Sequence, residues 1–146
     1  MIIDTTYLLP LVGISVNSDL FSAVEKGTTN LDFDDTQVSE ISLFEIQAKS
    51  AKLAIAHSTV VEALSEIESV FEIVPFGEKS VIQASFELRK KLPDYIDCVI
   101  IASAISRKTA ILTEDRSILA LQRHIGDTYG ISVLNIDQMI RHSSRI

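Results

Sequence analysis

Three acidic residues lie where strands are expected to end or helices to begin: Asp4, Asp97 and Asp115. A fourth, Glu45, lies on the inward side of the helix expected from Ile41. Asp4 follows Ile2-Ile3, and Asp115 follows Ile111-Leu112 by three residues. Functional sites of open parallel sheets form outside the carboxyl ends of the strands, so acids that follow two central strands can meet there. Carboxylates gathered in a dry crevice repel one another and raise one another's pKa values. Bound divalent cations would make such a cluster tolerable, and oxygen ligands suit Mg²⁺ and Mn²⁺.

Other metal and redox chemistries are poorly supported. The three histidines are isolated and show no HxH or HExxH spacing, which argues against a zinc site. Cys98 is the single cysteine and lies in an apolar run, so we expect a small core residue and no disulfide, as in a reducing cytoplasm. The first ten residues lack a basic segment, and no apolar run reaches about 18 residues, so neither a signal peptide nor a membrane span is expected.

Each acid also has a purely structural interpretation. Asp4 and Asp115 could cap the helices that follow them, and so could Asp94, which comes after a proline. Asp97 lies in the first turn of an expected helix, where an acid complements the helix dipole, but it borders the buried stretch. Glu45 could pair with the lysine four residues later. The residues taken singly therefore leave capping and catalysis both open.

The elements that must position these acids follow from hydrophobic periodicity and turn residues. Strands are predicted at 2–3, 36–39, 71–75, 109–112 and 131–136, and helices at 5–14, 17–24, 41–56, 58–69, 78–92, 94–106, 115–122 and 137–142. Residues 28–36 are predicted to be a loop. In the helix at 58–69, Val61, Leu64 and Ile67 are expected to point inward. Strands that alternate with helices favour a parallel sheet covered on both faces. The length of 146 residues fits one domain, 1–146.

The charge is unevenly distributed along the chain. The net charge is -7, which is unfavourable for general binding of polyanions. Residues 1–78 hold 13 acids and 3 bases, whereas residues 79–146 hold 7 acids and 10 bases. This asymmetry indicates either an anionic partner on one side or simply solvated helix faces. Candidate contacts to an anionic polymer are Lys90, Lys91, Arg107, Lys108, Arg116 and Arg123.

Four segments, IIDTTYLL, ISLFEIQAK, DYIDCVIIASAI and ILTEDRSIL, resemble in order and spacing the four acidic motifs of PIN-domain nucleases. The closest resemblance is to small, stand-alone ribonucleases of the VapC-toxin type. By this resemblance the family's four acids correspond to Asp4, Glu45, Asp97 and Asp115. Auxiliary positions correspond to Thr5 or Thr6 after the first acid, to Thr113 two residues before the last, and to Asp94.

The resemblance implies a flavodoxin-like three-layer α/β/α sandwich around a parallel sheet. It also implies a ribonuclease that depends on Mg²⁺ or Mn²⁺, a toxin role with an antitoxin partner, and a homodimer. The metal would be held by Asp4, Asp97 and Asp115, with Glu45 binding directly or through water, and Thr113 or Thr5 would orient a ligand carboxylate. One departure is the acidic segment 30–37, which would be an unusual wall for an RNA groove.

Two other functions remain possible on the sequence. A dehalogenase-type phosphatase carries a second acid two residues after its strand-end Asp, but Thr6 occupies that position here. A response-regulator receiver has a lysine at the end of a late strand, whereas Lys108 precedes its strand. Both differences weaken an aspartyl-phosphate function. A catalytically inert binding or regulatory subunit, in which the acids serve only as caps, is the second alternative.

Overall fold

A parallel sheet forms the centre of the computed structural model, which describes residues 1–143 and the side chains of residues 1–140. Within these residues the sheet has five strands in the order β3-β2-β1-β4-β5. They are β1 (Ile2–Ile3), β2 (Gln37–Ser39), β3 (Glu72–Val74), β4 (Ile111–Leu112) and β5 (Val133–Leu134). All pairings are parallel, and Ile2 of β1 is in register with both Gln37 and Ile111. Strands β2 and β3 thus lie on one side of β1, and β4 and β5 lie on the other, so the strand order reverses between β1 and β4.

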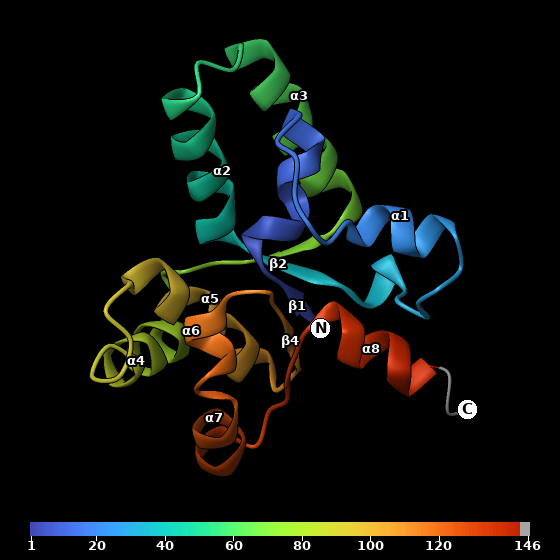
Figure 1. Cartoon of the computed structure of the whole chain (residues 1–146). Helices are drawn as coiled ribbons and strands as arrows, with labels where there is room; N and C mark the ends of the chain where they lie inside the picture. Colours follow the sequence, from blue (N-terminus) through green and yellow to red (C-terminus); the bar gives the residue numbers. More distant parts are fainter. Residues whose placement is uncertain (144–146) are drawn as a thin grey trace.

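Helices cover both faces of this sheet (Figure 1). In chain order they are η1 (Thr5–Val12), α1 (Leu20–Glu25), η2 (Phe33–Asp35), α2 (Glu40–Lys52), α3 (His57–Val70), α4 (Lys79–Leu88), α5 (Tyr95–Arg107), α6 (Arg116–Leu119), α7 (Gln122–Tyr129) and α8 (Ile136–Ser143). Figure 1 shows α2 and α3 rising above the sheet and α4 to α7 lying below it. The predicted three-layer α/β/α arrangement is confirmed.

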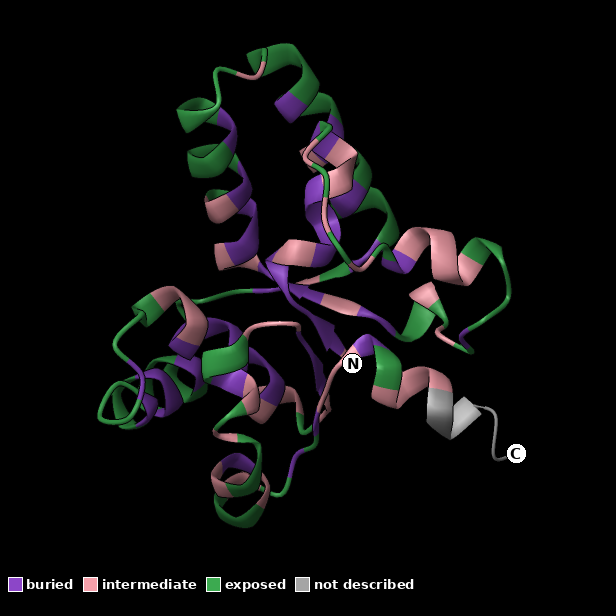
Figure 2. Cartoon of the chain, viewed as in Figure 1, coloured by how far each residue is buried: buried purple, intermediate pink, exposed green. Residues whose placement is uncertain are grey.

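Alternation along the short strands produces two separate cores. Successive strand residues point to opposite faces, so Ile2 and Ile111 enter one core while Ile3 and Leu112 enter the other. The first core is filled mainly by α4 to α7, and the second by η1 and α1 to α3 together with Ile136 of α8. Figure 2 shows the buried residues concentrated in the sheet and on the helix faces that meet it. Within the described residues, no helix is long and apolar enough to cross a membrane.

Several predicted elements differ in detail from the structure. The first helix ends at Gly13 as expected, but it is a 3-10 helix that includes Pro10. The segment predicted as a loop contains the short helix η2, and the expected helix at 115–122 is the four-residue α6, followed by α7, which the pattern missed. The helix predicted to reach residue 56 ends at Lys52, because Ala54 adopts a positive φ of 56°.

The buried face predicted for α3 is wrong in part. Val61 is 61% exposed, whereas the fully buried positions of this helix are Val60, Ala63 and Ile67. On α2 the apolar Phe44 is 57% exposed, while the polar Ser42 and Ser50 are buried. The physical reason for α3 is that it packs against η1 and α2, and the side that meets them carries Val60, Ala63 and Ile67 rather than Val61.

Candidate functional site

Asp4 lies at the carboxyl end of β1, where the strand order reverses, and is 5% exposed. Its Oδ1 accepts a hydrogen bond of 2.7 Å from the backbone N–H of Thr5, so it caps η1 as predicted. Its Oδ2 accepts a second bond of 2.6 Å from the Thr113 hydroxyl at the end of β4. Both oxygens of this buried carboxylate are therefore held, one by the start of η1 and the other from the end of β4.

Thr113 links Asp4 to the next acid. Its hydroxyl, buried at the end of β4, also accepts a 3.0 Å bond from the backbone N–H of Asp115. Asp115 in turn caps α6, because its Oδ1 accepts bonds of 2.8 and 3.2 Å from the N–H groups of Ser117 and Ile118. Thr113 thus bonds the carboxylate of Asp4, the contact that its predicted role in orienting a ligand would require.

The other two predicted acids come from helices on opposite sides of the sheet. Asp97 lies in the first turn of α5, three residues after Asp94, whose Oδ1 caps that helix through a 2.9 Å bond from the N–H of Ile96. Glu45 lies on α2, and its Oε2 is 4.0 Å from the Lys49 ammonium, as its structural interpretation predicted. The N-terminal end of α5 and the first half of α2 thus both present an acid toward the carboxyl edge of the sheet.

Electrostatic interactions show that the four acids face one another. The pKa of Asp4 is raised to about 6: burial is the largest cause, its two hydrogen bonds act in the opposite direction, and the charges of Glu45 and Asp115 add to the rise. Burial also raises the pKa of Asp97 to about 7, with further contributions from Asp115, Asp94, Asp4 and Glu45. A crevice with this much negative charge is suited to a cation.

The four acids have the ligand chemistry that a hard cation prefers, but they are not close enough together to form a metal site as they stand. All the side chains that converge are carboxylates, the ligand type that Mg²⁺ and Mn²⁺ prefer. Across the described residues, however, no three His, Cys, Asp or Glu side chains are close enough to form a ready metal site. A bound cation would offset the repulsion among these carboxylates and so favour drawing them closer.

Three residues that sequence reasoning did not single out support this edge. The Thr5 hydroxyl donates to Ser42 of α2 at 2.9 Å rather than to an acid. Glu114, which directly precedes Asp115, accepts 2.7 and 2.9 Å bonds at Oε1 from the Tyr7 hydroxyl and the N–H of Ile136. Glu114 thereby ties η1, β4 and α8 together. In the sequence, the feature that could have pointed to Ser42 is its position one helical turn before Glu45.

Replacing Tyr7 with phenylalanine should destabilise the protein by about 1.5–3 kcal/mol, because a hydrogen bond from a buried hydroxyl to a carboxylate is lost. The free energy of unfolding in urea measures this effect. Tyr129→Phe is the matched control, since the Tyr129 hydroxyl bonds Glu87 at an exposed position and its loss should cost little. Equal destabilisation by the two variants would contradict the structural role of the Tyr7–Glu114 pair.

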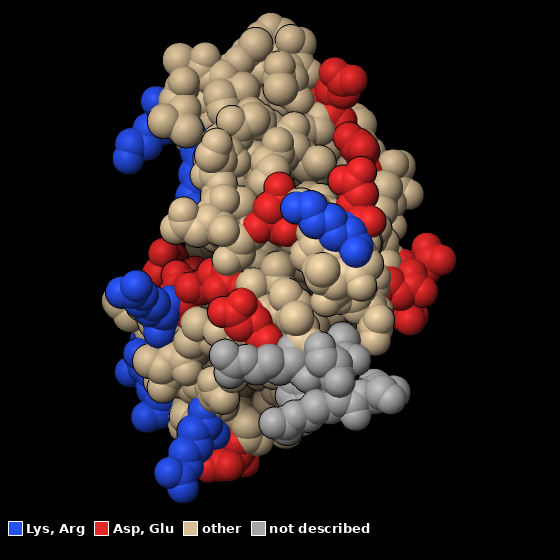
Figure 3. Space-filling model, turned by 45° about the vertical axis from the view of Figure 1, so that its right-hand side comes forward, with Lys and Arg blue, Asp and Glu red and all other residues tan. Residues whose placement is uncertain are grey.

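The predicted cationic residues fall into two groups. Arg116 directly follows Asp115, and Lys90 and Lys91 lie in the connection just before Asp94, so these three border the acids. Arg107 forms a two-bond ion pair with Glu78 at the opposite end of α5, about 15 Å along the helix from Asp97. Figure 3 shows Lys and Arg gathered on the lower left, beside a group of acids.

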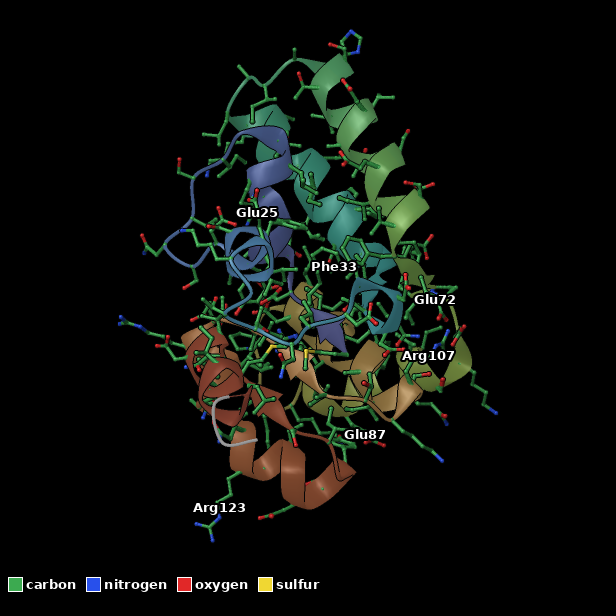
Figure 4. The ribbon with its side chains drawn as sticks, turned by 90° about the vertical axis from the view of Figure 1, so that its right-hand side faces the viewer. Glu25, Phe33, Glu72, Glu87, Arg107 and Arg123 are labelled. Carbon is green, nitrogen blue, oxygen red and sulfur yellow. The ribbon has the colours of Figure 1, made fainter. Side chains whose placement is uncertain are left out.

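The other two members of the cationic set lie away from the acids. Lys108 follows Arg107 as the C-cap of α5 and shares its remote position. Arg123 on α7 is 3.9 Å from Asp127 and extends outward (Figure 4), while Arg107 and Glu72 lie near each other on the other side of that view. The structure therefore brings together only part of the predicted cationic set.

The acidic segment 30–37 lies at the opposite edge of the sheet from the four acids. It leads into β2 at the amino end of the strand, and the amino terminus at Met1 donates a 3.0 Å bond to the carbonyl of Asp35. Because parallel strands share their direction, this amino edge is separated from the crevice by the length of the sheet. The segment does not line the crevice.

Fold and site together define a class: a three-layer α/β/α protein with acids gathered where the order of its parallel strands reverses. The chain belongs to the PIN domain family, whose sequence model matches residues 1–124. PIN domains are generally nucleases, so the family membership supports hydrolysis of nucleic acid. No curated protein matches the sequence.

Solved structures share the fold across nearly the whole chain. FitAcB from Neisseria gonorrhoeae has a TM-score of 0.63 and 18% identity, and the match covers 92% of this chain and 96% of that one. VapBC-5 from Mycobacterium tuberculosis has a TM-score of 0.60 and 18% identity, with 92% and 97% covered. VapBC2 from Rickettsia felis, bound to a promoter DNA fragment, has 0.63 and 18%, with 92% and 96% covered. At these identities the similarity establishes the fold.

Proposed function

We propose that this chain is a ribonuclease that requires Mg²⁺ or Mn²⁺ and hydrolyses RNA phosphodiester bonds, within a single PIN-like domain of residues 1–146. The observation that carries the proposal is that Asp4 and Asp115 follow the paired strands β1 and β4 at the carboxyl edge of the sheet, with Glu45 and Asp97 within reach of their charges. Burial, together with this repulsion, raises the pKa values of Asp4 and Asp97. Membership of the PIN domain family supports the same reaction class.

In this proposal Asp4, Asp97 and Asp115 hold the metal, and Glu45 binds it directly or through water. The metal supplies charge neutralisation at the scissile phosphate and a more acidic water molecule. Thr113 keeps Asp4 in place through its 2.6 Å bond, and the capping bonds of Asp115 fix its position at α6. No side chain is needed as a covalent nucleophile.

The partners in the proposal are RNA, an antitoxin protein and a second copy of the chain, in the cytoplasm. Lys90, Lys91 and Arg116 would contact RNA phosphates because they border the acids. The toxin role is supported by VapBC-5, a member of a family of toxin-antitoxin systems that shares this fold. A catalytically inert subunit would have the same fold. A measurement of metal binding distinguishes it from the nuclease, because only the nuclease needs to bind the metal.

Millimolar Mn²⁺ should raise the melting temperature by about 5 °C at neutral to alkaline pH, through preferential binding to the folded state. The rise should be smaller near pH 5, because protons on Asp4 and Asp97 compete with the metal. Differential scanning fluorimetry, with an EDTA reference at each pH, measures both effects. Absence of any rise at alkaline pH would favour the inert alternative.

Stability without metal should fall as pH increases. The pKa values of Asp4 and Asp97 are raised to about 6 and about 7, above the roughly 3.9 of an unfolded aspartate. The folded state therefore binds more protons between about pH 4 and pH 7, and this contribution is lost as pH rises through that window. In EDTA, Asp97→Asn should make the melting temperature less dependent on pH across the same range.

A further inference from the structure

Glu114 lies between two residues of the candidate site but has partners of its own. It follows Thr113 and directly precedes Asp115, the N-cap of α6. Its Oε1 accepts a 2.7 Å bond from the buried Tyr7 hydroxyl and a 2.9 Å bond from the N–H of Ile136. The carboxylate next to Asp115 is therefore held by groups outside the proposed metal site.

The contacts of Glu114 and Asp115 lie on opposite faces of the sheet. Tyr7 and Ile136 belong to the second core, which η1 and α8 help to fill. Asp115 instead caps α6 through the N–H of Ile118, whose side chain lies in the first core. Glu114 is thereby kept apart from the crevice in which the charge of Asp115 reaches the other acids.

The elements on either side of this turn are too short to fix it by themselves. β4 has two residues and α6 has four, which is about one helical turn. Helices of this length are not stable alone, so their place in the fold depends on tertiary contacts. The Thr113 hydroxyl supplies one such contact, to Asp4 at 2.6 Å. Glu114 adds a second attachment one residue closer to Asp115, so that both η1 and the start of α8 hold the turn.

We propose that Glu114 is a positioning residue of the metal site and that it holds Asp115 beside Asp4. It acts through the Tyr7 hydroxyl and the N–H of Ile136, and it does not itself bind the metal. This inference rests on the metal-dependent function proposed above and adds to it a fifth acid with a different role. Metal affinity then depends on the two bonds that Oε1 accepts and not on the charge of Glu114.

Two substitutions separate position from charge. Glu114→Ala removes both bonds, whereas Glu114→Gln keeps a carbonyl oxygen that can accept both. The Kd for Mn²⁺, measured by electron paramagnetic resonance of the free ion, should rise about tenfold in Glu114→Ala, because the loss of partners that orient a metal ligand commonly has effects of that size. In Glu114→Gln the Kd should stay within about threefold of that of the parent.

RNA cleavage gives a second readout. At a Mn²⁺ concentration near the Kd of the parent, kcat should fall about tenfold in Glu114→Ala, while KM for RNA stays within about twofold, since the cations proposed to contact RNA are unchanged. Far-UV circular dichroism at the assay temperature checks that each variant is folded. Destabilisation alone would not produce this split between kcat and KM in a folded protein.

Val81→Ala is the matched control for stability. Val81 is fully buried on α4 and follows Ser80, whose hydroxyl is 2.7 Å from that of Ser106 near the carboxyl end of α5, the end remote from the acids. This variant should melt at a lower temperature than the parent but bind Mn²⁺ as the parent does. Tyr7→Phe removes one of the two bonds and should raise the Mn²⁺ Kd less than Glu114→Ala does.

Two results would overturn the proposal. One is a Mn²⁺ Kd for Glu114→Ala within about twofold of that for Val81→Ala. The other is an equal loss of affinity in Glu114→Gln and Glu114→Ala, which would make Glu114 a metal ligand through its charge. A parent that binds Mn²⁺ but cleaves no RNA would refute the ribonuclease function alone, because the Kd values still decide the role of Glu114. A parent that binds no Mn²⁺ would overturn both.

Discussion

Asp97→Asn is expected to abolish Mn²⁺-dependent cleavage of RNA, with a loss of at least about a thousandfold in rate, because a metal ligand becomes a neutral amide. The fold should be preserved. Asp97 is partly exposed, and the charges of Asp115, Asp94, Asp4 and Glu45 all act against its ionised form. Without metal, the melting temperature at alkaline pH should therefore equal or exceed that of the parent. Cleavage of labelled RNA and thermal unfolding are the two measurements.

Asp97 gives a cleaner test than Asp4. Both oxygens of Asp4 accept hydrogen bonds, so an amide there would place an N–H₂ group against another donor and disturb the fold. Asp19→Asn is the matched control for the chemical change, because Asp19 caps α1 away from the site and asparagine caps helices equally well. If Asp97→Asn cleaves RNA as fast as Asp19→Asn, the metal-site assignment is wrong.

Thr113→Val should reduce both stability and activity. The substitution keeps the shape but removes the bond to Asp4 at 2.6 Å and the bond from the N–H of Asp115 at 3.0 Å, in a fully buried position. We expect a loss of about 2–3 kcal/mol in the free energy of unfolding. A loss of about 10- to 100-fold in cleavage rate is expected as well, since partners that orient a metal ligand commonly have effects of that size.

The pH dependence distinguishes positioning from simple destabilisation. The Thr113 bond lowers the pKa of Asp4, so its removal should raise that pKa above about 6 and shift the acidic limb of the pH–rate profile upward. Thr113→Ser retains the hydroxyl and should restore most of the rate and the original profile. An unchanged acidic limb in Thr113→Val would mean that Thr113 only stabilises the fold.

Helix ends were predicted correctly where they depend on residues close together in the sequence. Gly13 ends the first helix in the left-handed conformation, and Asp94 and Asp115 cap the helices that follow them. These outcomes depend on hydrogen bonds between residues two or three apart, which local residue types control. The helix faces were harder to predict: Val61 was expected to be buried but is exposed, because the side of α3 that packs on η1 and α2 carries Val60, Ala63 and Ile67 instead.

What the sequence determined by itself is the places of Asp4, Asp97 and Asp115 at the ends of elements, and the alternation of strands and helices. What only the tertiary structure decided is their partners: Thr113 reaches Asp4 across 109 positions, and Tyr7 reaches Glu114 across 107. These contacts arise because β4 pairs with β1. Periodicity encodes which face of an element is buried, but strand order depends on packing between distant segments. The family resemblance therefore gave Thr113 or Thr5 as the partner of a carboxylate, and only the pairing of β4 with β1 decided that Thr113 bonds the second oxygen of Asp4.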